Sequence, residues 1–330
     1  MSKLKLSIAL CTYNGKRFLR EQLDSLARQT RLPDEVVVGD DGSTDDTLEI
    51  LERWAAEVPF PVRITRNEKN LGFAKNFEAV MLRCTGDVIF PCDQDDVWGA
   101  EKLEKMAAVF EQSPEVGVVY CHRVYINQNG EEAPLSENEK MIWYTYLFPD
   151  FLTREHPDGA GCMMAVRSEI ARKMLPLPAH WEHDMWLYIS ASNLCRVVSI
   201  PDVLIRYRFH ADNLSGHQRN NNITSRRTYY RDSLIQYRWD ELRWKEILEY
   251  WQAFPENSYK RAYFAAAAPY RRHMNVRVDV QDHLICKLPK FLWEVLTFGY
   301  FRFPQPLRCM LFDLKEGVLI RLRGNNQDIP

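Results

Sequence analysis

Several features that would assign a protein to a common class are absent from this 330-residue sequence. No apolar run reaches the roughly 18 to 20 residues of a membrane-spanning helix, and the amino terminus lacks a signal-peptide pattern. The eight cysteines form no Cys-x-x-Cys pair, which suggests neither a zinc site nor a disulfide framework. The formal net charge of −2 shows no global bias toward nucleic acid. We therefore expect a cytoplasmic protein with reduced cysteines and no nucleic-acid partner.

Charge is unevenly divided between two predicted parts of the chain. Residues 206–330 hold 21 Lys and Arg against 13 Asp and Glu, a balance of +8, which leaves 22 against 32, or −10, for residues 1–205. Since 46% of the residues are hydrophobic, the chain can form one full α/β domain and an appendage. We place the domain over residues 1–215 and the appendage over 216–330.

The appendage is predicted to be mostly helical, with a long helix over residues 225–251. Residues 284–323 that follow are rich in aromatic side chains with flanking Lys and Arg. Apolar faces edged by cations can lie in a bilayer interface, which would make the protein peripheral to the inner face of the membrane. A helical cap packed on the first domain explains the pattern equally well, so both interpretations stay open.

Alternating strand and helix patterns predict that the first domain is α/β. Four apolar runs are typical of buried strands: residues 6–10, 35–39, 61–65 and 88–92. Apolar residues at helical spacing lie between them, and this order favours a parallel sheet with right-handed crossovers. Farther on, residues 196–200 and 203–207 are predicted to be two strands separated by a turn at Pro201 and Asp202.

The most informative segment follows the strand predicted at 88–92, where Asp93, Asp95 and Asp96 place three carboxylates in four positions. That strand would carry them beyond the carboxyl edge of the sheet, where open α/β folds bind ligands. Three adjacent carboxylates repel one another without a counter-ion, and their hard oxygens suit Mg²⁺ or Mn²⁺. An Asp-rich turn, with Asp96 only capping the next helix, is the alternative.

A second acidic cluster, residues 40–46, follows the strand predicted at 35–39. Because both clusters end strands of one sheet, we expect them to face the same crevice. Donors for an anionic or nucleotide ligand come before the next predicted helix: Asn67, Asn70, Leu71, Gly72, Lys75 and Asn76. For any single one of these residues, ordinary turn chemistry is at least as good an explanation.

Five motifs, in this order, resemble those of family 2 glycosyltransferases: Thr12-Tyr13-Asn14, Asp40-Asp41-Gly42-Ser43-Thr44-Asp45, Asn70-Leu71-Gly72, Asp93-Gln94-Asp95-Asp96-Val97-Trp98 and His183-Asp184-Met185-Trp186. They span roughly the first 215 residues. The resemblance implies a GT-A fold, which is a Rossmann-like mixed sheet flanked by helices, here with the helical appendage after it.

The resemblance also implies roles for individual residues. Donor-nucleotide binding would fall to Thr12, Tyr13, Asn14, Asp40, Asp41, Asn70, Gly72, Lys75 and Asp93. A divalent metal, Mn²⁺ or Mg²⁺, would be held by Asp95, with His210 completing its shell, and Arg208 would counter the phosphates. The donor sugar or the acceptor would lie near Asp96, Trp98, Gly161 and His183. Asp184 would be the catalytic base.

A purely structural role could also explain several of these residues. Asp184 could be only a helix cap, and a lone histidine such as His210 is more often structural than a ligand. Gly161 could let a sugar approach the backbone closely, or it could serve a turn that needs no ligand.

The function implied by the resemblance is inverting transfer of a hexose from a nucleotide sugar to a glycan or lipid-linked glycan acceptor. The motifs most resemble bacterial rhamnosyltransferases of cell-surface polysaccharide assembly, such as O-antigen, so dTDP-rhamnose is the first expected donor. UDP-linked galactose, glucose or N-acetylhexosamine is the alternative. Two alternatives from other classes stay open. A nucleotidyltransferase would usually want a Gly-rich basic loop after the first strand, and residues 11–17 offer little of that. A non-catalytic scaffold would tolerate loss of the acidic residues, which are intact here.

Overall fold

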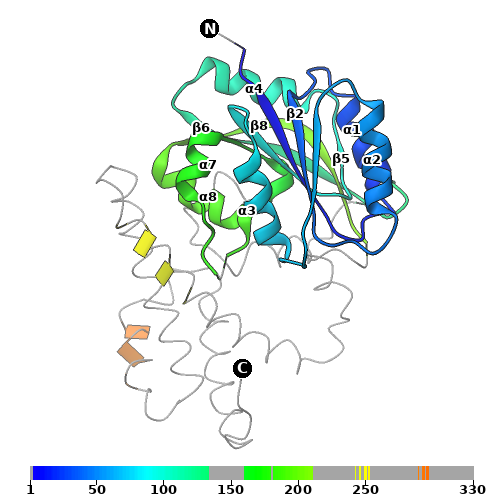
Figure 1. Cartoon of the computed structure of the whole chain (residues 1–330). Coiled ribbons are helices and arrows are strands. Elements are labelled where there is room, and N and C mark those ends of the chain that lie inside the picture. The colour runs from blue at the N-terminus through cyan, green and yellow to red at the C-terminus, as the bar shows by residue number, and fades with distance from the viewer. Residues whose placement is uncertain are drawn as a thin grey trace, which may run out of the picture. The chain divides into compact units, whose positions relative to one another are not determined.

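The computed structural model describes residues 3–133, 160–179 and 181–210, with isolated positions between 242 and 296. The chain divides into two compact units, Met1–Lys140 with His156–Gly216, and Met141–Glu155 with His217–Pro330. All the elements bounded below belong to the first unit (Figure 1). The predicted domain boundary stays a prediction. The predicted helix over 225–251 and the aromatic stretch over 284–323 lie almost wholly outside the described residues.

The first half of this unit alternates strands and helices, as the sequence predicted. Its elements are β1 (Leu6–Thr12), α1 (Leu19–Ala27), β2 (Glu35–Asp40), α2 (Thr47–Glu57), β3 (Val62–Arg66), α3 (Phe73–Arg83), β4 (Val88–Cys92), β5 (Val97–Trp98) and α4 (Lys102–Gln112). The second half holds β6 (Val116–Ile126), the 3₁₀ turn η1 (Gly161–Met163), β7 (Met164–Arg167), α7 (Ser168–Met174), α8 (His183–Leu194) and β8 (Arg196–Arg208).

The strands form one mixed eight-stranded sheet in the order β3-β2-β1-β4-β7-β6-β8-β5. The predicted parallel arrangement is confirmed for β3, β2, β1 and β4. β7 then runs antiparallel to both β4 and β6, while β6 and β8 are parallel. Since β1 lies between β2 and β4, the chain changes its direction of winding there, and such a switch point opens a crevice at the carboxyl edge of the strands.

Helices cover both faces of the sheet, so its central strands are buried. Figure 1 shows α1 and α2 on one face and α3, α7 and α8 on the other. Every residue of β1, β2 and β4 is buried, which explains their nearly continuous apolar sequences. α1 contributes Leu19, Leu23 and Leu26 to this core, each fully buried and each stabilising the fold by about 1.5 to 3 kcal/mol.

The predicted pair of strands near residue 200 is wrong, because β8 is one strand of 13 residues. Its pairing with β6 passes from Tyr120 opposite Ser199 to His122 opposite Val203, so β8 carries two more residues than β6 between these pairs. Pro201 and Asp202 lie in this irregularity. A proline cannot donate to a ladder hydrogen bond and is tolerated at a bulge, which is why the dipeptide looked like a turn.

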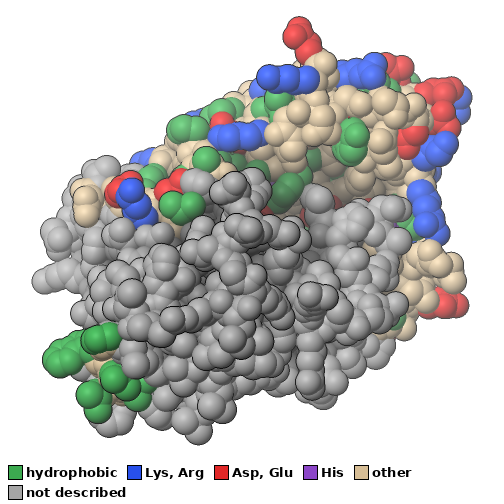
Figure 2. Space-filling view, turned by 90° about the horizontal axis from the view of Figure 1, so that it is seen from below, with side chains coloured by type: hydrophobic (Ala, Val, Ile, Leu, Met, Phe, Trp, Pro, Cys, Tyr) green, Lys and Arg blue, Asp and Glu red, His purple; other side chains and the backbone are tan. Residues whose placement is uncertain are grey.

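Two surface properties concern the described residues only. Among them, no helix combines the length and the apolar character that crossing a membrane requires. On the face in Figure 2, Lys and Arg side chains of the described part are interspersed with Asp and Glu.

Candidate active site

The acidic loop between β4 and β5 lies at the carboxyl edge of the sheet, beside the switch point. Asp93 directly follows the last residue of β4, and Thr12 is the last residue of β1. Because β4 pairs in parallel with β1, these two residues lie at the same edge of the sheet. Asp40 ends β2, the next strand along. The two acidic clusters therefore follow strands that flank β1, which agrees with the predicted common edge.

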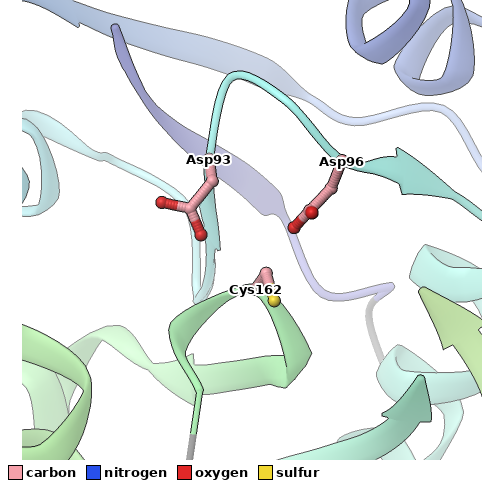
Figure 3. Close-up of side chains that lie close together, drawn as sticks. All are labelled: Asp93, Asp96 and Cys162. Carbon is pink, nitrogen blue, oxygen red and sulfur yellow. The ribbon is translucent and has the colours of Figure 1, made fainter. Parts of the chain in front are cut away.

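Two carboxylates of this loop converge on a thiol. Cys162 Sγ and one oxygen each of Asp93 and Asp96 lie within 4.8 Å of one another, and Figure 3 shows both carboxylates directed from the loop toward the η1 turn. Burial and then the charges of Asp96 and Asp95 raise the pKa of Asp93 well above its usual range. Burial and then Asp95 raise the pKa of Asp96 to about 7. Without a cation, at least one proton is therefore retained here near neutral pH.

One carboxylate oxygen of Asp96 has no hydrogen-bond donor among the described residues. Arg208 donates its backbone N–H to Asp96 Oδ1 at 3.1 Å. Oδ2 of the same carboxylate is buried and has no hydrogen-bond partner within bonding distance among the described residues. The interaction of the Cys162 thiol with this carboxylate lowers the pKa of Asp96, against the larger effect of burial. A buried carboxylate oxygen without a donor is costly, and a bound cation would relieve that cost.

Asp95 points to a different partner from its neighbours. Its Oδ2 lies 2.9 Å from His210 Nε2, and the His210 ring contacts Phe18 at a centroid distance of 4.6 Å. The structure thus joins the two predicted metal ligands, although they are 115 positions apart in the sequence.

Arg208 holds the acidic loop in place from the end of β8. Its guanidinium donates from Nε to the Asp95 carbonyl at 2.9 Å and from Nη2 to Glu21 Oε2 at 2.5 Å. Longer bonds reach the carbonyls of Asn127 and Gln128. Only 1% of the Arg208 side chain is exposed, and its donors already have protein acceptors, so the role in countering phosphates stays a prediction and the structure shows instead that Arg208 fixes the loop.

The predicted nucleotide side is an ordered network around two aspartates. Asp40 is buried and accepts from Thr12 Oγ1 at 3.0 Å and from the N–H of Ser43. Asp41 accepts from the side chain of Asn67 at 2.8 Å, from Leu71 N–H at 2.8 Å and from Gly72 N–H at 2.9 Å. Asn70 donates to the Asp41 carbonyl. Gly72 adopts φ +81°, a conformation that glycine allows without strain.

A glutamine that the sequence did not single out joins the two halves of this edge. Gln94 accepts from the Tyr13 N–H at 2.8 Å and donates to the Tyr13 carbonyl at 3.0 Å. The Tyr13 side chain is 48% exposed, which leaves its ring accessible to a planar ligand. Asn14 accepts from the Thr44 N–H at 2.8 Å and so ties the first loop to the second.

Across the acidic loop, α8 presents the predicted base. Asp184 lies in the first turn of α8, and its Oδ2 accepts from Gly161 N–H at 3.2 Å. Glu182, not Asp184, occupies the cap position, so the cap explanation for Asp184 does not apply. Asp184 is near enough to Asp93 for its charge to raise the pKa of that carboxyl.

His183 and Trp98 are both packed in protein. His183 is buried and stacks on Phe77 at a centroid distance of 3.8 Å; burial lowers its pKa, which favours the neutral ring. The Trp98 indole is 3% exposed and lies under the Lys102 ammonium at 3.2 Å. Lys102, also buried, donates to the Cys162 carbonyl at 2.6 Å and anchors the turn that faces the acidic loop.

The predicted residues thus fall into two sets. Those gathered at the carboxyl edge are Thr12, Tyr13, Asn14, Asp40, Asp41, Asn70, Gly72, Asp93, Asp95, Asp96, Gly161, Asp184 and His210. The other set comprises Trp98 and His183, which are packed in protein, and Lys75, which donates to Glu78 and to the Leu177 carbonyl rather than to the acidic loop. Cys162 and Lys102 were missed because nothing in their local sequence distinguishes them, and Gln94, although it lies inside the acidic motif, was given no role of its own.

The donor set at this edge fits a divalent cation. The groups available are the carboxylates of Asp93, Asp95 and Asp96 and the imidazole of His210. A hard or borderline cation would neutralise and coordinate such groups, and it would also bind the buried Asp96 Oδ2, which has no hydrogen-bond donor among the described residues.

Comparison with known sequences identifies relatives over the same region. The family model "Glycosyl transferase family 2" matches residues 7–175, about half of the chain. The amylovoran biosynthesis glycosyltransferase AmsE of Erwinia amylovora is 28% identical over 238 residues, which cover 68% of this chain and 84% of AmsE. An uncharacterized glycosyltransferase of Nostoc sp. is 27% identical over 217 residues, and an uncharacterized protein of Mycobacterium bovis is 28% identical over 212. The alignments span only 66% and 59% of the lengths of these last two relatives.

Solved structures support the fold. TarS residues 1–349 of S. aureus, solved in complex with UDP-GlcNAc, aligns with a TM-score of 0.59 at 20% identity, covering 99% of this chain and 94% of that one. The mannosyltransferase PcManGT of Pyrobaculum calidifontis, in complex with GDP-Man and Mn²⁺, aligns with a TM-score of 0.51 at 17% identity, covering 98% and 88%. At these identities the likeness concerns the GT-A-like fold alone. With the family model matched over the strands that carry the acidic clusters, this chain belongs to glycosyl transferase family 2.

Proposed function

We propose that this protein is an inverting glycosyltransferase that moves a hexose from a nucleotide sugar to a glycan or lipid-linked glycan acceptor. The observation that carries the proposal is the convergence, at one sheet edge, of Asp93, Asp95 and Asp96 with the base candidate Asp184. Family membership supports the reaction class.

On the donor side, two groups of residues would divide the work. Asp41, with the loops that contain Thr12, Tyr13 and Asn14, would bind the nucleoside, and the exposed Tyr13 ring could stack on a base. Asn70, Gly72 and Asp93 would complete this side. Asp95 and His210 would hold Mn²⁺ or Mg²⁺, which when bound would stabilise the negative charge of the departing diphosphate.

On the acceptor side, Asp184 would take the proton of the attacking hydroxyl. Its Oδ2 is oriented by the Gly161 N–H, so the carboxylate is fixed before an acceptor arrives. A positioned general base contributes roughly 10²- to 10⁴-fold to the rate. Direct displacement by the acceptor inverts the anomeric centre, and no residue at this edge is evidently placed as a covalent nucleophile.

Rhamnose from dTDP-rhamnose is our first donor, and surface-polysaccharide assembly our first pathway. The sequence motifs favour the donor, and a relative named for amylovoran biosynthesis supports the pathway class. A UDP-linked hexose or N-acetylhexosamine is the second candidate, since TarS, which shares the fold, was solved with UDP-GlcNAc.

A thermal-shift screen of nucleotide sugars tests the proposal. With Mn²⁺ or Mg²⁺ present, one donor should raise the melting temperature, because a ligand at 100 times its Kd stabilises the folded state by about 2.7 kcal/mol. Asp95→Ala should abolish that metal-dependent shift, and Glu169→Gln, an exposed carboxylate on α7, should leave it intact. If no dTDP- or UDP-sugar shifts the wild-type melting temperature, the proposed donor class is wrong.

A further inference from the structure

The η1 turn brings a thiol to the acidic loop, and no role described above uses it. We propose that Asp93, Asp96 and Cys162 form a second cation site, separate from the Asp95–His210 pair, that selects thiophilic divalent ions such as Zn²⁺ and Cd²⁺. The binding itself is independent of the proposed function. Inhibition of transfer by such ions, which we also expect, rests on it.

The three candidate ligands come from two segments that the fold fixes separately. Asp93 and Asp96 belong to the β4–β5 loop, and Cys162 belongs to the turn before β7 (Figure 3). Their ligand atoms lie within 4.8 Å of one another. Zinc lies about 2.3 Å from sulfur and 2.0 to 2.2 Å from carboxylate oxygen, which places tetrahedral ligand atoms roughly 3.5 Å apart. The most distant pair of ligand atoms must therefore approach by at most roughly 1 Å. Asp93 is half-buried, and its carboxylate has no hydrogen bond to a described residue, which leaves the side chain free to make that movement; only its backbone carbonyl is bonded, to the Cys92 thiol.

A second observation points to a ligand at this place. Asp96 is 1% exposed, yet its Oδ2 receives no hydrogen bond from any described residue. Figure 3 shows this carboxylate directed toward the Cys162 thiol. A buried carboxylate oxygen without a hydrogen-bond donor is unfavourable, and coordination of a cation would offset that cost.

Charge at the site also favours a cation. Two cationic side chains, Lys102 and Arg123, act on Asp96 or Cys162, and the Lys102 ammonium is already bonded to the Cys162 carbonyl and lies over the Trp98 ring. The opposing charges are the three aspartates of the β4–β5 loop together with Asp184, whose charge acts on Asp93. The local balance is therefore negative whenever the carboxylates are ionised.

The ligand types distinguish this site from the other one. Asp95 directs its Oδ2 to His210 at 2.9 Å, and neither residue belongs to the group around Cys162. Thiolate is a soft ligand that suits zinc and cadmium, while Mg²⁺ and Mn²⁺ prefer oxygen. We therefore expect hard ions to favour the Asp95 side and thiophilic ions the Cys162 side.

Binding requires only the loss of protons. The Cys162 S–H bond breaks as the sulfur–metal bond forms, and its proton leaves to solvent together with any proton shared by the two carboxylates. No electron is transferred. An ion held there would occupy both carboxylates beside the proposed sugar site, so it would inhibit transfer until a chelator removed it.

Cadmium alone provides the test, because a cadmium–thiolate bond absorbs in the ultraviolet. Full-length, metal-free protein in thiol-free buffer is titrated with Cd²⁺, and we expect one equivalent to produce the charge-transfer band. Zn²⁺ added afterwards should remove the band by competition, whereas Mg²⁺ should not.

Three variants assign the band to this site. Cys162→Ser should abolish it, and Cys84→Ser, a matched buried cysteine at the end of α3, should keep it. Asp96→Asn should retain the band but weaken cadmium binding at least about tenfold, the lower end of what losing even an outer partner of a metal site costs. His210→Ala should leave the cadmium affinity unchanged, which separates this site from the proposed donor-metal site.

A measurement on the wild type protects the test against a variant that fails to fold. X-ray absorption of the zinc-loaded protein should show one sulfur at about 2.3 Å with oxygen ligands at about 2.0 to 2.2 Å. A zinc shell without sulfur, or a band that survives in folded Cys162→Ser, would overturn the proposal. Neither result depends on a donor or on transfer, so failure here is distinguishable from failure of the proposed function.

Discussion

Among single residues, Asp184 provides the most direct test of the proposed chemistry. Asp184→Asn keeps an oxygen that can accept from the Gly161 N–H but cannot take a proton from the acceptor. We expect turnover to fall roughly 10²- to 10⁴-fold while metal-dependent donor binding stays near wild type. Steady-state transfer rates and donor titrations measure the two effects separately. Full activity in the variant would mean that the base is assigned wrongly.

The raised pKa of Asp96 leads to a prediction of how the free energy of unfolding depends on pH. Burial and the charge of Asp95 raise this pKa from the ordinary value of 3.8 to about 7. The folded state of the metal-free protein therefore binds the proton more tightly than the unfolded state. This contribution is complete below pH 3.8 and is lost as the pH rises toward 7.

Urea unfolding of metal-free wild type and Asp96→Asn between these pH values measures that loss. The variant should gain stability relative to wild type as the pH rises from 3.8 to 7, by on the order of 4 kcal/mol, at about 1.4 kcal/mol per pKa unit. Saturating Mn²⁺ should reduce the difference, because a cation at Asp95 would offset the negative charge that helps to raise the pKa of Asp96. Parallel stability curves for the two proteins would contradict a raised pKa at this carboxyl.

At the scale of elements, the end of β8 determines where the acidic loop lies. Arg208→Lys keeps one positive charge but loses the forked bonds to Glu21 and to the Asp95 carbonyl. We expect a loss of roughly 2 to 3 kcal/mol, below the figure for a fully buried pair because Glu21 is half-exposed.

Thermal denaturation and donor titration together check this role of β8. Donor affinity should fall along with stability, since the loop that carries Asp95 and Asp96 would no longer be fixed. Arg206→Lys is the matched control. Arg206 lies two residues before Arg208 on β8 and is exposed, and among the described residues its side chain donates only to the Gly130 carbonyl. If both variants lost donor affinity equally, Arg208 would have no special role in fixing the acidic loop.

The elements that the sequence predicted well are those whose signal is local. β1, β2 and β4 are buried along their whole length, so each shows a nearly continuous apolar run. β8 was predicted as two strands because Pro201 and Asp202 are typical of a turn, and only its partner β6 reveals the irregularity. Strand pairing of this kind is not visible in a single sequence.

The site shows the same division between local and distant signals. The acidic clusters could be placed at the sheet edge, because each follows a recognisable strand. The role of Arg208 could not be predicted, since its partners Glu21 and Asp95 lie 187 and 113 positions away. Cys162 was missed for a related reason: a cysteine before an apolar strand is ordinary until the fold brings it to two carboxylates.

For the whole molecule, the charge asymmetry leads to a prediction about membranes. Residues 206–330 carry a balance of +8, and the aromatic stretch over 284–303 is flanked by Lys and Arg. A basic residue near an anionic membrane surface contributes about 1 kcal/mol, so several together would hold the protein at such a surface. We therefore expect the full-length chain to sediment with vesicles rich in acidic phospholipids and to be released by high salt.

Two changes separate charge from aromatic insertion in this association. The double variant Lys287→Gln and Lys290→Gln should weaken vesicle binding about tenfold or more, from the loss of roughly 2 kcal/mol. Truncation after Gly216 should remove the remaining binding. Lys3→Gln with Lys5→Gln, which neutralises two lysines in the acidic part of the chain, is the control and should bind as wild type. If the intact chain does not sediment with acidic vesicles at low salt, the basic segment has another role, and a helical cap on the catalytic domain becomes the better interpretation.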